Sequence, residues 1–255
     1  MKYVAPVVVL FLSATACTPS LRRAGEEPSY FPMTADRVWE YRLRKLPSDE
    51  IWPVVIHSRG AKFVPALGRT AVIFDEQYPD QVVPVAFFLS EGFLQSEIGL
   101  RYRLERGMEL MPIGTQPMRI MPVPPRVGMS WAYFEQVFGA TTDDAGFEIR
   151  WNGSIARAES VTVPAGVFRD CLRVESIALH RLPMDTHPHE YRYLDWYAPN
   201  IGLVKSEYAS GEDGEIFTRM ELVSFARGTR PSEPAPAPPL DGQQWATRDL
   251  GGFGS

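Results

Sequence analysis

The chain has 255 residues, of which 45% are hydrophobic and 22% are charged, so it can build the packed core of one large or two small domains. Its formal net charge is -5 and its isoelectric point is about 5.5. No basic stripe or cluster interrupts this acidic balance, which excludes a typical nucleic-acid-binding protein.

The N-terminus has the pattern of an export signal. Lys2 supplies a positive charge, Val4–Leu12 is a short apolar run, and small residues lead up to Cys17. An apolar run of this length is typical of a signal peptide and is too short to span a membrane. Small residues that end at a cysteine resemble the lipobox of bacterial lipoproteins, although Ala14 stands where that family usually has Leu. We therefore expect residues 1–16 to be removed.

This resemblance implies that Cys17 becomes the lipidated first residue and tethers the protein to a membrane. Several acyl chains on one cysteine give stable anchoring, whereas a single chain is marginal. Thr18 follows the cysteine, and by resemblance to enterobacterial sorting the lack of Asp there favours the outer membrane, with the domain in the periplasm or on the cell surface. The alternative is an ordinary secretory peptide cut nearby. Residues 17–29 are polar and predict a tether.

The folded part is predicted to begin near Tyr30 and to be mainly β-sheet with little helix. Segments rich in Val, Ile, Phe and Tyr follow one another, and Gly or Pro separates most of them. In the first half we expect strands at Phe31–Leu43, Val54–Ser58, Lys62–Phe74, Val82–Leu89 and Phe93–Glu105. A helix over residues 87–98 is an alternative to strand there. The Pro- and Met-rich segment Met108–Met121 is predicted to be irregular.

Two segments, Phe31–Tyr41 and Val123–Phe134, resemble each other weakly. Each has a proline and a short loop, followed by a Trp-x-Tyr pair that enters a strand. The two pairs are Trp39 with Tyr41 and Trp131 with Tyr133. This repetition predicts either two similar antiparallel lobes, residues 30–121 and 122–227, or two halves of one continuous sheet.

In the second half, Val161–Glu175 has the pattern of a strand, a turn and a second strand. Pro164 ends the first strand, and Gly166 completes a tight turn. Cys171 lies in the second strand and is predicted to be a buried small hydrophobe without a disulfide partner. Further strands are expected at Trp131–Phe138, Phe147–Ala158, Glu190–Tyr197, Leu203–Tyr208 and Ile216–Phe225. The Pro-rich residues 228–255 predict a disordered tail.

Three motifs of this half occur together. They are Gly128-x-x-Trp131-x-Tyr133, VPAGVF followed by CLRVE, and WYAPNIGLVK. In combination they resemble a broad group of uncharacterised bacterial secreted and lipoprotein domains, over about Val123–Phe225. The resemblance implies antiparallel half-barrel sheets, loosely like those of the lipoprotein-localisation carriers. It carries no known activity and therefore no catalytic residues. Val167 and Asn200 are small departures from the pattern of the group, which usually has Thr and Gly at these positions.

The best polar constellation comprises His180, Asp185, His187, His189 and Glu190. The pair His187 and His189 can place two imidazoles on one face of an extended chain, and nearby carboxylates suit zinc. Prolines on both sides predict a loop, however, where solvated histidines are common, so a metal site is the less favoured interpretation. Nucleophile elbows, phosphate loops and dinucleotide fingerprints are absent from the sequence. We therefore expect neither an enzyme nor a cofactor.

Aromatic residues are the other candidates for function. They either pack the core and pair across strands, or line a concave groove for a ligand. The candidate ligand-binding residues are Trp39, Tyr41, Trp131, Tyr133, Trp196 and Tyr197. The leading prediction is a non-enzymatic envelope lipoprotein that binds an apolar ligand, such as a lipid or acyl chain, or an envelope protein. The alternative is a structural or assembly factor of a cell-envelope complex, followed by a metal-binding protein or hydrolase.

Overall fold

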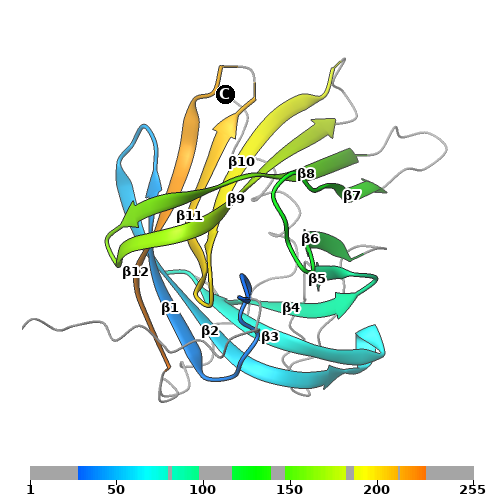
Figure 1. The fold of residues 1–255 in the computed structure, drawn as a ribbon. Helices are drawn as coiled ribbons and strands as arrows, with labels where there is room; N and C mark the ends of the chain where they lie inside the picture. The colour runs from blue at the N-terminus through cyan, green and yellow to red at the C-terminus, as the bar shows by residue number, and fades with distance from the viewer. Residues whose placement is uncertain are drawn as a thin grey trace, which may run out of the picture.

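The computed structural model describes residues 28–79, 82–97, 117–138, 147–181, 187–211 and 213–227. In these ranges it contains twelve β-strands and one short 3-10 helix. The strands form one strongly curved antiparallel sheet, so the predicted fold class is confirmed (Figure 1). Cys17, the predicted signal peptide and the Pro-rich tail lie outside the described residues, and the statements on them remain predictions.

The strands differ in length, and the two longest form one hairpin. Their bounds are β1 Arg37–Lys45, β2 Glu50–Val64, β3 Arg69–Gln77, β4 Val82–Ser90, β5 Phe93–Glu97, β6 Met118–Pro122, β7 Ser130–Phe138, β8 Phe147–Val163, β9 Gly166–Arg181, β10 His189–Ala198, β11 Gly202–Ser210 and β12 Ile216–Arg227.

The sheet is a simple meander with one long-range join. Its strand order is β6-β5-β4-β3-β2-β1-β12-β11-β10-β9-β8-β7. Strands adjacent in sequence are therefore adjacent in the sheet wherever they pair, and β1 pairs with β12 to connect the first six strands to the last six. The two halves thus form one continuous sheet. Figure 1 shows this sheet curling until its end strands, β6 and β7, approach each other.

Side chains close the seam between β6 and β7. Within the described residues no backbone ladder joins these strands. Instead, the indole Nε1 of Trp131 on β7 donates a hydrogen bond to the carbonyl oxygen of Arg119 on β6, at 2.8 Å. Met121, Trp131 and Ile155 belong to one buried cluster that spans the seam. The sheet is therefore nearly closed and barrel-like, with a core on its concave side.

Two predicted elements of the first half are wrong in part. Met108–Met121 was expected to be irregular, but β6 lies at its end, because its residues pair with β5 and most of them are buried. The expected strand Lys62–Phe74 is broken by the 3-10 helix Pro65–Leu67. Gly68 follows that helix with a φ of 60°, which a glycine adopts without steric cost. The strand therefore ends at the proline, and β3 begins after the glycine.

The region for which a helix was the alternative is β-sheet. Strands β4 and β5 occupy its described part up to residue 97, separated by a turn at Glu91 and Gly92. In the described part of the chain, no helix is long and apolar enough to cross a membrane.

The predicted turn after Val163 is confirmed. Val163 pairs with Gly166, whose φ of 133° only glycine adopts readily, and the two residues between them form the tip of the β8–β9 hairpin. The backbone N–H of Ala165 donates to the carbonyl of Leu222 at 3.0 Å, so the tip packs against β12 (Figure 1). Cys171 is fully buried, as predicted, and burial raises the pKa of its thiol to about 11.

Stacked aromatic rings cross the second half of the sheet above small residues. Tyr133 stacks on Trp151 with ring centroids 4.8 Å apart, and Trp151 contacts Tyr193 at 4.7 Å. Gly153 lies beneath this row. A Cβ atom at this position would lie 2.8 Å from the ring of Trp131, closer than packed carbon atoms approach. The absence of a side chain at Gly153 therefore lets the rings reach the seam.

We predict that the substitution Gly153→Ala destabilises the fold by about 1–3 kcal/mol through overpacking, measured by chemical denaturation. In an ordinary strand the same change would stabilise by about 0.5–1 kcal/mol, so the sign of the effect tests the contact. Asn152→Ala, on the exposed opposite face, is the matched control and should be nearly neutral. An unchanged or increased stability of Gly153→Ala would contradict the proposed packing.

Candidate ligand-binding cavity

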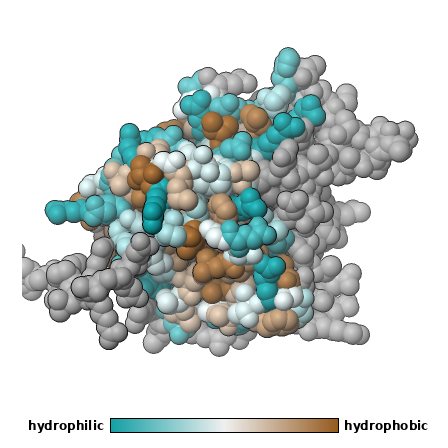
Figure 2. Space-filling model, turned by 45° about the vertical axis from the view of Figure 1, so that its right-hand side comes forward, coloured by the Kyte–Doolittle hydropathy of each residue, from teal (hydrophilic) through white to brown (hydrophobic). Residues whose placement is uncertain are grey.

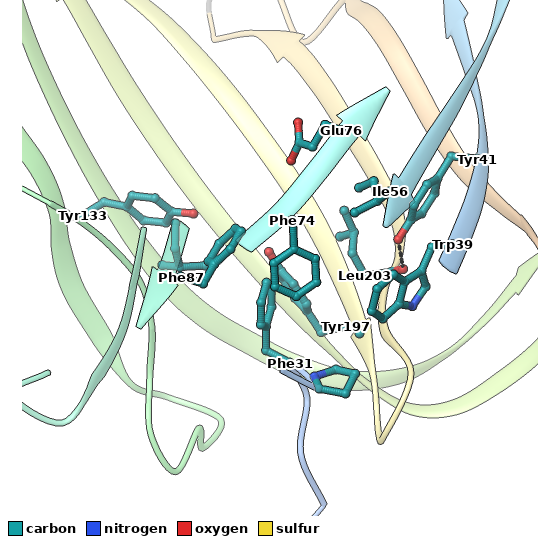
Figure 3. A pocket seen from close by; sticks show the side chains of 13 residues that line it. Phe31, Trp39, Tyr41, Ile56, Phe74, Glu76, Phe87, Tyr133, Tyr197 and Leu203 are labelled. Carbon is teal, nitrogen blue, oxygen red and sulfur yellow. Dashed lines mark hydrogen bonds between the residues drawn. The ribbon is translucent and has the colours of Figure 1, made fainter. Parts of the chain in front are cut away.

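A cavity of about 170 Å³ lies on the concave side of the sheet (Figure 3). Strands from both halves contribute to it, and so does the segment that precedes β1. Most of its lining is aromatic or aliphatic. The lining residues are Phe31, Pro32, Trp39, Tyr41, Ile56, Phe74, Glu76, Phe87, Ile120, Tyr133, Tyr197, Gly202 and Leu203.

Trp39 and Tyr41 point to the cavity from alternate positions of β1. Both are buried, and their polar atoms bind the backbone of the chain leading into β11. The indole Nε1 of Trp39 donates to the carbonyl of Ile201 at 2.7 Å, and the hydroxyl of Tyr41 donates to the carbonyl of Leu203 at 2.9 Å (Figure 3). Because these groups are satisfied by the protein, the aromatic faces are left for apolar contacts.

Phe31 enters the cavity from residues 28–36, the segment before β1. Its ring centroid lies 4.6 Å from that of Phe87 and 5.6 Å from that of Phe74. The sequence predicted a strand from Phe31 onward, but the strand begins only at Arg37. Pro32 has no N–H for a ladder, which accounts for the later start.

The turn between β10 and β11 holds this segment in place. The backbone N–H of Asn200 donates to the carbonyl of Ser29 at 2.6 Å, and the N–H of Ser29 donates to Oδ1 of Asn200 at 3.2 Å. Gly202 allows close packing, since a Cβ there would lie 3.3 Å from Pro32. The segment therefore covers one end of the cavity, seen at the bottom of Figure 3.

Glu76 is the one charged residue among those that line the cavity. It follows Phe74 at a spacing of two on β3, so both side chains lie on the concave face. The hydroxyl of Tyr78 donates to Oε2 of Glu76 at 3.1 Å. Burial raises the pKa of the Glu76 carboxyl, and the bond from Tyr78 opposes this in part. In Figure 3, Glu76 lies at the opposite end of the group from Phe31.

A second carboxyl, that of Asp195, lies on the same concave face. Asp195 alternates with Trp196 on β10 and therefore points to the same side as Tyr197. Burial raises its pKa to about 6, and a hydrogen bond with Ser206 acts in the opposite direction. Burial raises the pKa of Tyr133 and Tyr197, and the charge of Asp195 adds to both shifts. The concave face thus combines aromatic rings with two carboxyls.

The structure separates the six predicted aromatic residues into two groups. Trp39, Tyr41, Tyr133 and Tyr197 line the cavity, whereas Trp131 lies at the seam and Trp196 on the opposite face of the sheet. The indole Nε1 of Trp196 donates to Oε1 of Glu159 at 2.6 Å, and the ammonium of Lys205 lies 4.6 Å from its ring. Trp196 is buried in the hydrophobic core outside the cavity lining, with charged groups at its Nε1 and ring face.

Sequence reasoning missed the other lining residues, among them Phe31, Phe74, Glu76 and Phe87, and it missed Asp195, which lies beside the cavity. Two of them carried a signal. Glu76 shares a face with Phe74, and Asp195 stands between two tyrosines of one face, so each places an acid in a row of aromatic residues. The register that brings their strands together was not visible in the sequence.

The predicted metal ligands His187 and His189 are both exposed. His189 pairs with His180 across β9 and β10. Burial lowers the pKa of His180, and the charge of His189 lowers it further. Asp185 lies outside the described residues. Among the residues that the structure describes, no group of three or more His, Cys, Asp and Glu is placed to hold a metal ion.

Comparisons with known proteins find one family model and two crystal structures that are similar to this chain. The family model DUF3108-like matches residues 140–222, which fall within the region of the predicted resemblance. A crystal structure from Bacteroides fragilis, described as that of "a putative exported protein with YmcC-like fold", matches with a TM-score of 0.52 and 17% identity, over 78% of this chain and 99% of that chain. A "putative lipoprotein" from Parabacteroides distasonis matches with a TM-score of 0.50 and 16% identity, over 79% of this chain and 100% of that chain.

No match is found among curated proteins. The two crystal structures show that this chain shares their fold over almost the whole of each relative. This similarity to proteins described as exported or as lipoproteins agrees with the predicted resemblance to bacterial secreted and lipoprotein domains.

We predict that Asp195 makes stability fall as pH rises. Its folded pKa of about 6 exceeds the ordinary value of 3.8, so the folded state binds more protons than the unfolded state between these values. The contribution of Asp195 to the free energy of unfolding is fully present below about pH 4 and is lost by about pH 6. Between these values the free energy falls by up to about 1.4 kcal/mol per pH unit. Asp195→Asn should therefore gain stability relative to the wild type between pH 4 and pH 7, measured by urea denaturation.

Asp213→Asn is the matched control. The backbone N–H of Glu215 lowers the pKa of Asp213, so the stability change that follows its ionisation lies below about pH 4, and Asp213→Asn should differ from the wild type by a pH-independent amount between about pH 4 and pH 7. A pH-independent difference between Asp195→Asn and the wild type would contradict the burial of an ionisable Asp195.

Proposed function

We propose that this protein is an envelope lipoprotein whose curved sheet binds a small apolar ligand, or the apolar part of a lipid, in the cavity. The observation that carries the proposal is the aromatic cavity of about 170 Å³ on the concave side of the sheet. Ligand sites are typically concave and mostly apolar with a few placed polar groups, which is the composition found here. The comparisons support export and this fold, and they leave the ligand open.

The size of the cavity suits a compact ligand. An engineered protein cavity of about 150 Å³ binds benzene, so a space of about 170 Å³ accommodates a six-carbon body. Each buried methylene contributes about 0.8 kcal/mol, from which the costs of association are subtracted. A six-carbon probe is therefore expected to bind with a Kd of about 1 mM, and a longer natural ligand that extends out of the cavity would bind more tightly.

The cavity is partly open to solvent, and its lining is mostly apolar. Protein interiors are close-packed, and apolar side chains without packing partners on one side lose dispersion contacts. A bound apolar ligand would supply these contacts, which favours a binding role over simple core packing.

The segment at the covered end of the cavity leads directly to the predicted lipid anchor. Residue 28 is 11 positions from Cys17, so the connecting chain spans at most about 40 Å. A lipidated Cys17 would therefore hold the cavity close to the membrane surface. Figure 2 shows apolar side chains gathered on one face of the domain and bordered by hydrophilic ones, as expected where an apolar ligand approaches.

We predict that hexanol binds in the cavity, detected by saturation-transfer NMR and quantified by titration. Ile56→Trp fills the cavity from β2 and should abolish the transfer, because the indole occupies the space of the ligand. Ile177→Trp makes the same change at an exposed position of β9 and should bind hexanol like the wild type. Thermal melting of both variants verifies that they remain folded.

Equal hexanol binding by Ile56→Trp and Ile177→Trp would contradict the assignment of the cavity. Absence of hexanol binding by the folded wild-type protein at several millimolar probe would contradict the proposed function itself.

We predict that the mature protein begins at an acylated Cys17, as shown by mass spectrometry of the N-terminal peptide. Cys17→Ser removes the only lipid acceptor of the lipobox-like pattern and should move the protein from the membrane to the soluble envelope fraction. Cys171→Ser is the control that retains lipidation. An unmodified N-terminus at another residue would overturn the anchoring proposal.

A further inference from the structure

The charge balance of the cavity points to a particular class of ligand. Among the residues that line it, Glu76 is the one ionisable acid, and Lys, Arg and His are absent. The remaining ionisable groups of the lining are the phenols of Tyr41, Tyr133 and Tyr197, which burial keeps neutral. Asp195 adds a second carboxyl beside Tyr133 and Tyr197. An anionic headgroup would meet no positive charge there.

The aromatic rings of the lining favour a cationic group as well. Electron-rich ring faces attract cations, and aromatic cages are the usual solution for binding organic ammonium groups. The lining includes the rings of Trp39, Tyr41, Phe74, Tyr133 and Tyr197, with the carboxyl of Glu76 in the same cavity. We propose that the cavity selects an apolar molecule that carries a protonated amine, with the ammonium group paired to Glu76 and the apolar body against the rings. This inference rests on the proposed function and specifies its ligand.

The position of Glu76 allows such a pairing. Oε2 accepts the hydrogen bond from Tyr78 at 3.1 Å, and a carboxylate can accept further bonds at its two oxygens. Ile56 on β2 and Val83 on β4 flank Glu76 in the ladders, so neither neighbour supplies a cation. Tyr41 is the facing titratable group on β1. An ammonium group would thus be the counter-ion for a carboxylate that has none among these neighbours.

The proposed pairing has a defined pH dependence. Burial raises the pKa of Glu76 in the free protein, so protons compete with the ammonium ligand at acidic pH. Alkylamines remain protonated below about pH 10, as the side chain of lysine does. Affinity for an alkylammonium ion should therefore rise with pH as Glu76 loses its proton, above the range in which an ordinary glutamate titrates. Affinity for the corresponding alcohol should change little.

The test compares hexylamine, hexanol and hexanoate, which share one apolar body and differ in headgroup charge. NMR titrations of the full mature protein at pH 8 should show hexylamine binding at least about tenfold more tightly than hexanol, equivalent to about 1.4 kcal/mol, and hexanoate more weakly than hexanol. Glu76→Gln should remove the preference for the amine and change hexanol affinity by less than about threefold. Glu97→Gln alters a buried carboxyl outside the cavity lining and should keep the preference.

The outcomes separate this inference from the proposed function. If hexanol binds but hexylamine shows no preference in the wild type, or keeps its preference in Glu76→Gln, the ammonium inference is overturned and the apolar cavity stands. If none of the three molecules binds the folded protein, both fail. Tighter binding of hexanoate than of hexylamine would contradict the charge argument directly.

Discussion

The pairing of β1 with β12 is the interaction on which the rest of the structure depends. It joins residues that are far apart in the sequence, such as Trp39 and Phe225, and so it carries the largest loop-closure cost of the fold. Without it the chain would be two separate meanders of six strands. With it, one sheet is long enough to curl until β6 and β7 meet, and its concave face encloses a cavity.

The same join sets the wall of the cavity. It brings β1 close to the start of β11 and the turn before it, where Trp39 and Tyr41 donate to the carbonyls of Ile201 and Leu203. At the far end of the sheet the indole of Trp131 takes the place of a backbone ladder. The two Trp-x-Tyr pairs thus occupy the first strand of each half, and the tyrosine of each pair lines the same cavity.

Sequence patterns predicted the strands well because alternation and turn residues are local signals. They could not say which face of a strand becomes concave. Trp196 and Tyr197 are neighbours that must point to opposite faces, and only the folded sheet shows that Tyr197 lines the cavity. Phe31 was expected in a strand, but the contact of its segment with Asn200 is long-range and has no local signature. The acids Glu76 and Asp195 became visible only once the register placed them beside rings.

Buried carboxyls and an unfilled cavity both lower stability, and such features are expected at a ligand-binding site. The predicted tether leads into the segment that covers the cavity, which would link membrane anchoring to the binding site through one short stretch of chain. A crystal structure with 6-bromohexanol tests the central claim most directly, because bromine is located by its anomalous signal. The account predicts a bromine peak inside the cavity, among Phe31, Phe74 and Tyr197. Bromine found solely on the outer surface would contradict it.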